Sequence, residues 1–131
     1  EDATRAALDE QGWLHTGDVA LVDDDGLIYL VDRAKDLIIV SGFNVFPAEV
    51  EDVICEMAGV SECAVVGVPH PHTGESVKAF VVPAAGYAIE EDAVIEHCAE
   101  NLARYKCPQK VNFVDTLPQN LSGKVLRRAL R

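Results

Sequence analysis

The chain lacks the features of a membrane-spanning or disulfide-stabilised protein. No apolar run approaches the roughly 18 residues of a membrane span, and no signal peptide is visible. The four cysteines form no CxxC pair, and a chain of 131 residues buries enough surface to need no covalent staple. We expect reduced thiols and a cytoplasmic protein, with peripheral attachment at the inner face of the membrane as the alternative.

Basic residues are scarce in most of the chain. It has 22 acidic and 11 basic side chains, a formal net charge of −11. Residues 1–103 contain 21 of the acids and only 4 bases, whereas residues 104–131 contain 1 acid and 7 bases. The overall charge disfavours nucleic acid as a partner. The basic C-terminal segment is the part that calls for a separate explanation.

Internal repeats, low-complexity stretches and an initiator methionine are also missing. The composition, with 49% hydrophobic and 25% charged residues, is typical of a globular domain. Because the first residue is Glu1, we expect the chain to be part of a longer protein.

Apolar runs and turn signals predict an α+β fold, in which a small mixed β-sheet is covered by helices. Asp23 to Gly26 separate two apolar runs and indicate a β-hairpin. Pro47 begins a helix that ends at Gly59. The expected strands are 19–22, 27–31, 37–40, 63–68, 77–82 and 111–114, and the other expected helices are 2–10, 90–102 and 125–131.

Two motifs in the first third of the chain offer groups for a nucleotide. Asp18 follows Thr16 and Gly17 on an expected turn, where its carboxylate can accept both hydroxyls of a ribose; the alternative is a carboxylate that only caps the turn. Arg33 can fork onto phosphate or sugar oxygens; the alternative is a solvated charged loop over residues 32–36.

Two further motifs contain glycine at an expected loop. In Ser41-Gly42-Phe43, glycine lets a ligand approach the backbone closely, although an ordinary strand connection has the same composition. Lys124 follows Gly123 at a loop-to-helix junction, where it is well placed to meet an anion. The spacing is not that of a Walker phosphate loop, and the alternative is a basic helix that complements its own dipole.

The order and spacing of these motifs resemble the C-terminal end of adenylate-forming enzymes. The motifs are GWLHTGD, DRAKDLIIVSGFNVFPAEVE and LPQNLSGKVLRR. This superfamily contains acyl- and aryl-CoA synthetases, luciferases and peptide-synthetase adenylation domains. The sequence is most similar to bacterial long-chain fatty acyl-CoA synthetases, chiefly through DRAKDLIIVSGFNVFPAEVED and GVPHPHTGESVKAFVV.

The resemblance implies a division of the chain into two domains. Residues 1–34, with the hairpin, match the last segment of a large N-terminal adenylation domain that is otherwise absent. Residues 35–131 match the complete small, mobile C-terminal domain. We expect the chain alone to be inactive, because the fatty-acid pocket and the phosphate-binding loop belong to the absent part.

The resemblance also implies a role for each motif in a two-step reaction. Lys124 matches the lysine that stabilises the first step, in which acid and ATP give acyl-adenylate and pyrophosphate. Asp18 and Arg33 match residues that bind ATP or AMP, and Lys35 matches the hinge about which the small domain rotates. Ser41, Gly42 and Phe43 match the loop that lines the coenzyme A tunnel for the second step, in which the thioester forms.

The expected ligands and partners follow from this reaction. They are ATP, Mg²⁺ and coenzyme A in the full-length enzyme, none bound tightly by this chain alone, together with a fatty acid and the missing N-terminal domain. No residue is assigned to a metal site. A lysine acetyltransferase acting on Lys124 is a further expected partner. The alternatives are an aryl or short-chain acyl-CoA ligase, a fatty acyl-AMP ligase, a carrier-protein-loading adenylation domain, and a non-catalytic regulatory module of the same fold.

Overall fold

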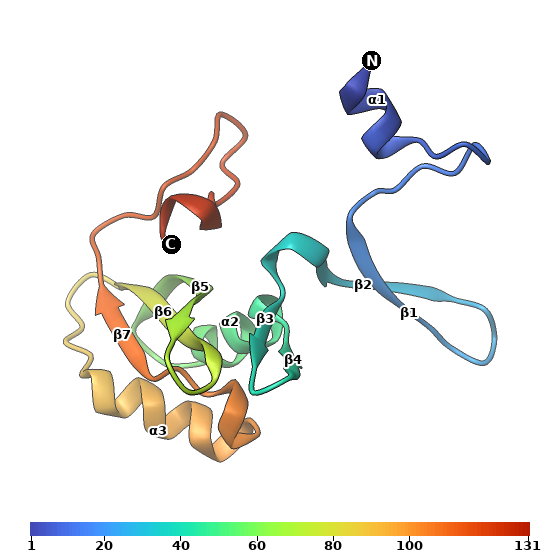
Figure 1. Ribbon diagram of the computed structural model, residues 1–131. Coiled ribbons are helices and arrows are strands. Elements are labelled where there is room, and N and C mark those ends of the chain that lie inside the picture. The colour runs from blue at the N-terminus through green and yellow to red at the C-terminus, as the bar shows by residue number, and fades with distance from the viewer. The chain divides into compact units, whose positions relative to one another are not determined.

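The computed structural model describes all residues from 1 to 131, and the chain separates into two compact units, Glu1–Lys35 and Asp36–Arg131. Figure 1 labels the elements of both units. The elements of the first unit are α1 (Asp2–Ala7), β1 (Asp18–Val22), β2 (Ile28–Arg33) and the start of the 3-10 helix η1 (Ala34–Asp36). The elements of the second are β3 (Ile38–Val40), β4 (Phe43–Val45), α2 (Pro47–Cys55), β5 (Val60–His70), β6 (Gly74–Pro83), α3 (Glu91–Asn101), η2 (Arg104–Lys106), β7 (Lys110–Phe113) and η3 (Arg127–Ala129).

The first unit is a two-stranded antiparallel hairpin preceded by a short helix. Asp23 organises the turn, because its Oδ1 accepts the Asp25 and Leu27 backbone N–H groups at 3.0 and 2.9 Å. Gly26 completes the turn with a φ of 83°. Large apolar side chains stay exposed on this unit, among them Trp13, Leu21, Val22, Ile28 and Leu30. A hairpin of two strands has no second layer in which to bury them.

The second unit is built on a five-stranded mixed sheet. Its order is β4-β3-β6-β5, and β7 pairs with β6 in parallel while every other pair is antiparallel. The apolar runs of β5 and β6 read as continuous rather than alternating because both faces of these strands are covered.

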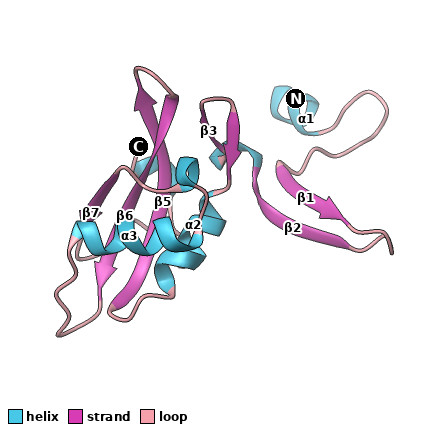
Figure 2. Ribbon diagram, turned by 90° about the horizontal axis from the view of Figure 1, so that it is seen from below, coloured by secondary structure: helices cyan, strands magenta, loops and turns pink.

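Two helices cover one face of this sheet. Val50 and Ile54 of α2 and Val94 and Cys98 of α3 are fully buried, and they belong to the same core cluster as the inward-facing residues of the strands. Their spacing places each pair on one side of its helix. Figure 2 shows α3 lying across β5, β6 and β7.

The segment after β7 covers the opposite face. Leu117 is buried together with Ala64, Val66 and Phe80, and Val125 and Leu130 pack against this second cluster. Figure 1 shows the segment, coloured from orange to red, leaving the end of β7 and turning back towards the C-terminus. The basic C-terminal segment is therefore packed against the sheet through its apolar residues.

The expected α+β fold with a mixed sheet is confirmed, and several local expectations need correction. Residues 43–45 form the strand β4, which the breaker-rich sequence SGFNVFP conceals. The strand β5 spans Val60–His70 and is longer at both ends than the expected strand 63–68. The expected C-terminal helix 125–131 is reduced to the 3-10 helix η3, because Leu126 donates its backbone N–H to Pro118 O at 2.8 Å, outside any helical pattern. None of the helices has the length and apolar composition that a membrane span requires.

Candidate functional site

Asp18 and Arg33 lie opposite each other at the open end of the β1–β2 hairpin. They are register partners, and Arg33 Nε lies 3.3 Å from Asp18 Oδ1. The backbone supports this end, because Ala34 donates its N–H to Gly17 O at 2.7 Å. Gly17 has a φ of 76°, which explains why glycine precedes the carboxylate.

The Asp18–Arg33 pair retains unused hydrogen-bonding capacity. Arg33 Nε is buried and has no hydrogen-bond partner, so its contact with the carboxylate is electrostatic only. The side chains of Asp18 and Arg33 are 30% and 40% exposed. A carboxylate and a guanidinium that are half-open to solvent form a surface suited to hydroxyl and phosphate oxygens.

Ser41 and Gly42 form the two-residue turn between β3 and β4. Their φ angles are 51° and 83°, and two positive values are the mark of a type I′ hairpin turn. The turn is tied to the β5–β6 connection, because Ser41 donates its backbone N–H to Thr73 O at 2.8 Å. A Cβ at Gly42 would meet no atom within 4 Å, so the space beside this glycine is open.

The side chain of Phe43 leaves this turn and stacks on Tyr105. The ring centroids are 4.8 Å apart with an interplanar angle of 27°. Next to Tyr105, Lys106 donates to both carboxylate oxygens of Glu49 at 2.9 and 3.0 Å. These hydrogen bonds raise the pKa of Lys106. The 3-10 helix η2 thus supports both the exposed Phe43 and the first turn of α2.

Lys124 lies at the end of a tight loop that Asn120 organises. Asn120 Oδ1 accepts hydrogen bonds from Ser122 N at 3.0 Å, Ser122 Oγ at 2.7 Å and Lys124 N at 2.9 Å. Asn120 N donates to Lys124 O at 2.9 Å, and Gln119 pairs with Val125 in an isolated antiparallel bridge. The Lys124 side chain is exposed, and the hydrogen bonds of Asn120 hold its backbone in place without a ligand.

The predicted site residues fall in both units. Asp18 and Arg33 are brought together in the first unit, and Lys35 lies in η1 at its end. Ser41, Gly42, Phe43 and Lys124 belong to the second unit, where separate sets of hydrogen bonds hold the Ser41–Phe43 turn and the Lys124 loop.

Sequence reasoning missed Asn120 and Tyr105 as supporting residues. Asn120 had a readable signal, because asparagine commonly accepts hydrogen bonds from backbone groups two residues ahead in a turn. Tyr105 had none, since its partner Phe43 is distant in sequence.

Three of the four cysteines are not activated nucleophiles. Burial raises the pKa of Cys63 and Cys107, and it raises the pKa of Cys98 to about 11. The neutral thiol is therefore the stable form at these three positions.

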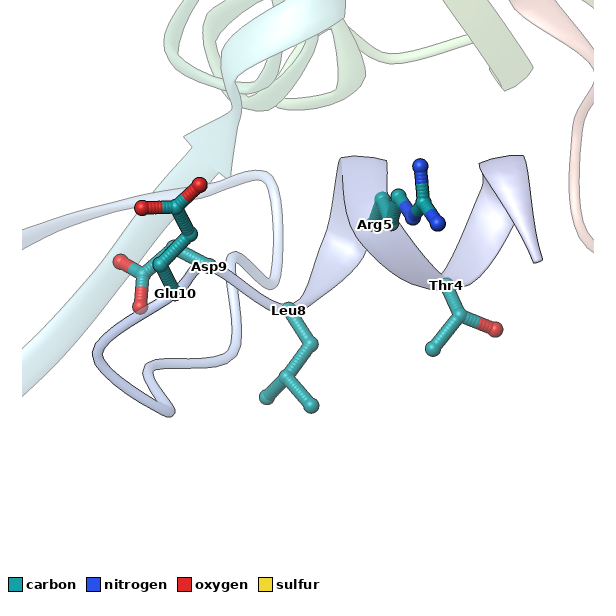
Figure 3. Close-up of a pocket in the computed structure, with 5 residues that line it drawn as sticks. All are labelled: Thr4, Arg5, Leu8, Asp9 and Glu10. Carbon is teal, nitrogen blue, oxygen red and sulfur yellow. The ribbon is translucent and has the colours of Figure 1, made fainter.

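A hollow of about 560 Å³ lies beside α1 and contains none of the predicted site residues. It is lined by Thr4, Arg5, Leu8, Asp9 and Glu10. Figure 3 shows Arg5 pointing to the opposite side of the helix from Leu8. Asp9 is already bonded to its own loop, because its Oδ1 accepts the Trp13 N–H at 2.9 Å. The polar groups do not converge on one point, and we assign this hollow no function.

Comparison with known families identifies the domain. The family model of the AMP-binding enzyme C-terminal domain matches residues 49–124. The chain belongs to this family. The match of this AMP-binding enzyme C-terminal domain to its family confirms the resemblance to adenylate-forming enzymes.

Individual relatives of this AMP-binding enzyme C-terminal domain are CoA ligases. A long-chain-fatty-acid–CoA ligase of Salmonella typhimurium is 51% identical over 130 residues, 99% of this chain and 23% of the relative. A 3-[(3aS,4S,7aS)-7a-methyl-1,5-dioxo-octahydro-1H-inden-4-yl]propanoyl:CoA ligase of Rhodococcus jostii is 48% identical over 130 residues, 99% of this chain and 25% of the relative. The ATP-bound crystal structure of MatB from Rhodopseudomonas palustris superposes with a TM-score of 0.91 at 43% identity, over 99% of this chain and 26% of that one. The chain spans about a quarter of the length of these relatives.

Proposed function

We propose that this domain is the C-terminal part of an ATP-dependent long-chain fatty acyl-CoA ligase, and that it supplies Lys124 to the first half-reaction and the Ser41–Phe43 turn to the second. The observation that carries the proposal is the exposed Lys124 on a loop fixed by Asn120. Its support is the family membership and the high identity to CoA ligases over 99% of the chain.

The first half-reaction needs fixed positive charge. The carboxylate of the acid attacks the α-phosphate of ATP, and pyrophosphate leaves, so one anion approaches another. The Lys124 ammonium stabilises the charge on the carboxylate and phosphate oxygens in the transition state. It acts as a fixed positive charge and not as a base.

The second half-reaction needs access for a thiol. The sulfur of coenzyme A attacks the acyl carbon of the adenylate, the thioester bond forms, and AMP leaves with the electrons of the broken C–O bond. The open space beside Gly42 provides room for the extended thiol arm, and Phe43, held by Tyr105, borders this space. Rotation about Lys35 exchanges Lys124 for this turn between the two steps.

Asp18 and Arg33 hold the nucleotide in this scheme. The Asp18 carboxylate accepts the ribose hydroxyls, and Arg33, whose Nε lies 3.3 Å from Asp18 Oδ1, offers its guanidinium to the nucleotide oxygens. We expect Asp18→Asn in the full-length ligase to raise KM for ATP by about tenfold, the scale of one lost charge-assisted hydrogen bond. The same change leaves the second half-reaction, started from supplied acyl-adenylate and coenzyme A, less affected.

The experiment that tests the proposal is Lys124→Ala in the full-length ligase that contains this chain. We expect adenylation, measured as pyrophosphate release, to fall about 10²-fold or more, the cost of one lost transition-state donor. Thioester formation from supplied acyl-adenylate should persist. Lys110→Ala is the matched control, because Lys110 is also an exposed lysine of this domain. Equal loss in both half-reactions contradicts the assigned role.

The acid class is tested by a chain-length series. Coenzyme A-dependent AMP release, measured with acids from short to long and with aryl acids, should peak at long-chain fatty acids. A peak at aryl or short acids would reassign the substrate, and AMP release without coenzyme A dependence would favour an acyl-AMP ligase or a carrier-protein acceptor. The isolated chain should show no turnover of ATP with any acid.

Acetylation of Lys124 by a lysine acetyltransferase is part of the proposal. Its exposed ammonium is accessible, and acetylation removes the charge that the first half-reaction uses. Mass spectrometry of the ligase after acetylation, combined with the pyrophosphate assay, tests it. Stoichiometric acetyl-Lys124 with full adenylation activity would reject the role.

A further inference from the structure

The guanidinium group of Arg127 is held by two carboxylates from distant parts of the chain. Arg127 Nε donates to Glu51 Oε1 at 3.0 Å, and the Nη2 atom donates to Glu51 Oε2 at 2.8 Å. The Nη1 atom donates to Asp36 Oδ2 at 3.2 Å. We call Arg127, Glu51 and Asp36 the arginine clasp.

The clasp is shielded from solvent. The three side chains are 19%, 18% and 13% exposed for Arg127, Glu51 and Asp36. Glu51 is itself oriented by the sheet, because its Oε1 also accepts the Val65 backbone N–H at 3.0 Å. A paired fork of this kind fixes the direction as well as the distance of its partners, which a lysine cannot reproduce.

The clasp lies at the end of the segment that contains Lys124. Arg127 follows Lys124 by three residues, and between them Leu126 is bonded to Pro118 and Val125 packs on the second core cluster. The loop over residues 118–126 is thus closed on itself by Asn120, and the clasp fixes it to α2 and β5. The side chains of Lys124 and Leu121 are exposed and do not anchor the loop themselves.

Asp36, the second carboxylate of the arginine clasp, lies at the boundary between the two units. Asp36 begins the second unit and directly follows Lys35. Arg127 therefore joins the Lys124 segment to the residue that follows the proposed hinge, across 91 positions of sequence. A rotation about Lys35 would carry Lys124 along as one body with Asp36 and α2.

We infer that Arg127 is a positioning residue for the adenylation half-reaction: by clasping Glu51 and Asp36, it sets where Lys124 stands relative to the hinge. The inference rests on the proposed function, because it gives Arg127 a task only if Lys124 acts in adenylation. Arg127 itself touches no reacting atom.

The test is Arg127→Lys in the full-length ligase. This change keeps the positive charge between the two partly buried carboxylates and removes the fork. Misplacement of a catalytic group by about 1 Å costs up to roughly 10²-fold, so we expect adenylation to fall about 10- to 100-fold. Thioester formation from supplied acyl-adenylate should stay within about twofold, because the Ser41–Phe43 turn is held by other contacts. Arg128→Lys is the matched control, since Arg128 is exposed and outside the clasp.

Asp36→Asn is the second variant, for the case in which Arg127→Lys does not fold. The amide is isosteric, accepts one hydrogen bond from Nη1, and leaves the Glu51 fork in place. We expect the same selectivity with a smaller loss of adenylation, about threefold to tenfold, since one charge-assisted bond is weakened. A structural readout accompanies both variants: the amide of Leu126 should exchange faster while the amides of β5 and β6 keep their protection.

The possible results separate this inference from the proposed function. Selective loss of adenylation in Arg127→Lys or Asp36→Asn, together with loss in Lys124→Ala, supports the clasp. Loss in Lys124→Ala with equal loss of both half-reactions in the clasp variants, or with no loss in them, overturns the positioning role and leaves the proposed function standing. Undiminished adenylation in Lys124→Ala overturns both.

Discussion

Lys106 contacts both carboxylate oxygens of Glu49, 57 positions earlier in the chain, at 2.9 and 3.0 Å. The Lys106 side chain is 21% exposed and that of Glu49 is 41% exposed, so the pair lies at the border of the core. It fixes η2 to the first turn of α2, and with η2 it fixes Tyr105, on which Phe43 stacks. The proposed coenzyme A turn is therefore supported by a pair that contacts no ligand.

We predict that Lys106→Met lowers the free energy of unfolding of this chain by about 1 kcal/mol at neutral pH, the upper range for a partly exposed ion pair. The bonds to Glu49 raise the pKa of Lys106 above 10.5, the ordinary value for a lysine, so the stabilisation is complete below that pH. It is lost as pH rises further and the ammonium deprotonates. Denaturant unfolding of both proteins at pH 7 and near pH 11 measures the effect.

The control for this prediction is Lys110→Met. Lys110 lies 3.7 Å from Glu91 with 63% of its side chain exposed, and its replacement should cost less than that of Lys106. An equal decrease in the free energy of unfolding for the two variants would show that the Lys106–Glu49 pair contributes no more than the exposed Lys110–Glu91 pair. A difference between Lys106→Met and the original chain that persists undiminished above the titration of Lys106 would contradict the electrostatic explanation.

Substitutions in the Ser41-Gly42 turn distinguish the cost of backbone strain from the loss of space for the thiol. Gly42 has a φ of 83°, so Gly42→Ala should cost the chain about 1–2 kcal/mol through the left-handed backbone alone. No atom lies within 4 Å of the added Cβ, so the chain should still fold. In the full-length ligase we expect thioester formation to fall further than adenylation, because the added Cβ enters the space proposed for the thiol arm. Pyrophosphate and thioester assays measure the two steps separately.

Ser41→Gly provides the opposite change at the neighbouring position. Ser41 adopts a φ of 51°, and glycine relieves this strain, so the chain should keep or gain stability. A thermal unfolding series of both variants gives the comparison. If Ser41→Gly impairs thioester formation as much as Gly42→Ala does, the loss in Gly42→Ala does not come from its added Cβ.

Asn120 can be tested without a substrate. Asn120→Ala removes an oxygen that accepts three hydrogen bonds, so amide exchange at Ser122 and Lys124 should become faster by about tenfold, the equivalent of one net hydrogen bond. Global stability should change little, because the loop is exposed. Asn120→Asp keeps the acceptor oxygen and should keep the protection. Unchanged exchange in Asn120→Ala would show that the loop is held by other contacts.

Cys98 makes stability depend on alkaline pH. Its thiol is fully buried, and burial raises its pKa from 9.0 to about 11. The unfolded chain therefore releases this proton at lower pH than the folded chain. Stability from Cys98 is complete below pH 9.0 and decreases as pH rises to about 11, by up to roughly 3 kcal/mol for a shift of this size.

The measurement is denaturant unfolding between pH 8 and pH 11, with Cys98→Ala as the reference. The alanine variant is less stable at pH 8 because it leaves a small cavity, but its stability should decline less steeply above pH 9.0. Parallel pH profiles of the two proteins would refute this account of Cys98. Iodoacetamide labelling should agree, with Cys98 labelled slowly at pH 8.

Several elements could be predicted because their signals are local. The Asp23–Gly26 turn has the acceptor and the glycine that a hairpin requires, and α2 begins at Pro47 as expected. Val50 and Ile54 are four residues apart in the sequence, a spacing that marks one side of a helix, and this is the side of α2 that the structure buries.

Other elements could not be predicted because non-local contacts create them. The strand β4 has three residues and exists through its register with β3, in which Ile38 pairs with Val45 and Val40 with Phe43. The C-terminal residues have the composition of a basic helix, yet Arg127 is drawn to Glu51 and Leu126 to Pro118. Here tertiary partners outweigh helix propensity.

The sequence by itself determined the family, the identity of the candidate residues Asp18, Arg33, Gly42 and Lys124, and the division into an acidic body and a basic end. This was possible because the type and spacing of residues are properties of the sequence and do not depend on folding. The tertiary structure alone decided what the basic end does. Charges 76 and 91 positions apart meet only when the chain folds, so the arginine clasp of Arg127 with Glu51 and Asp36 is a property of the fold.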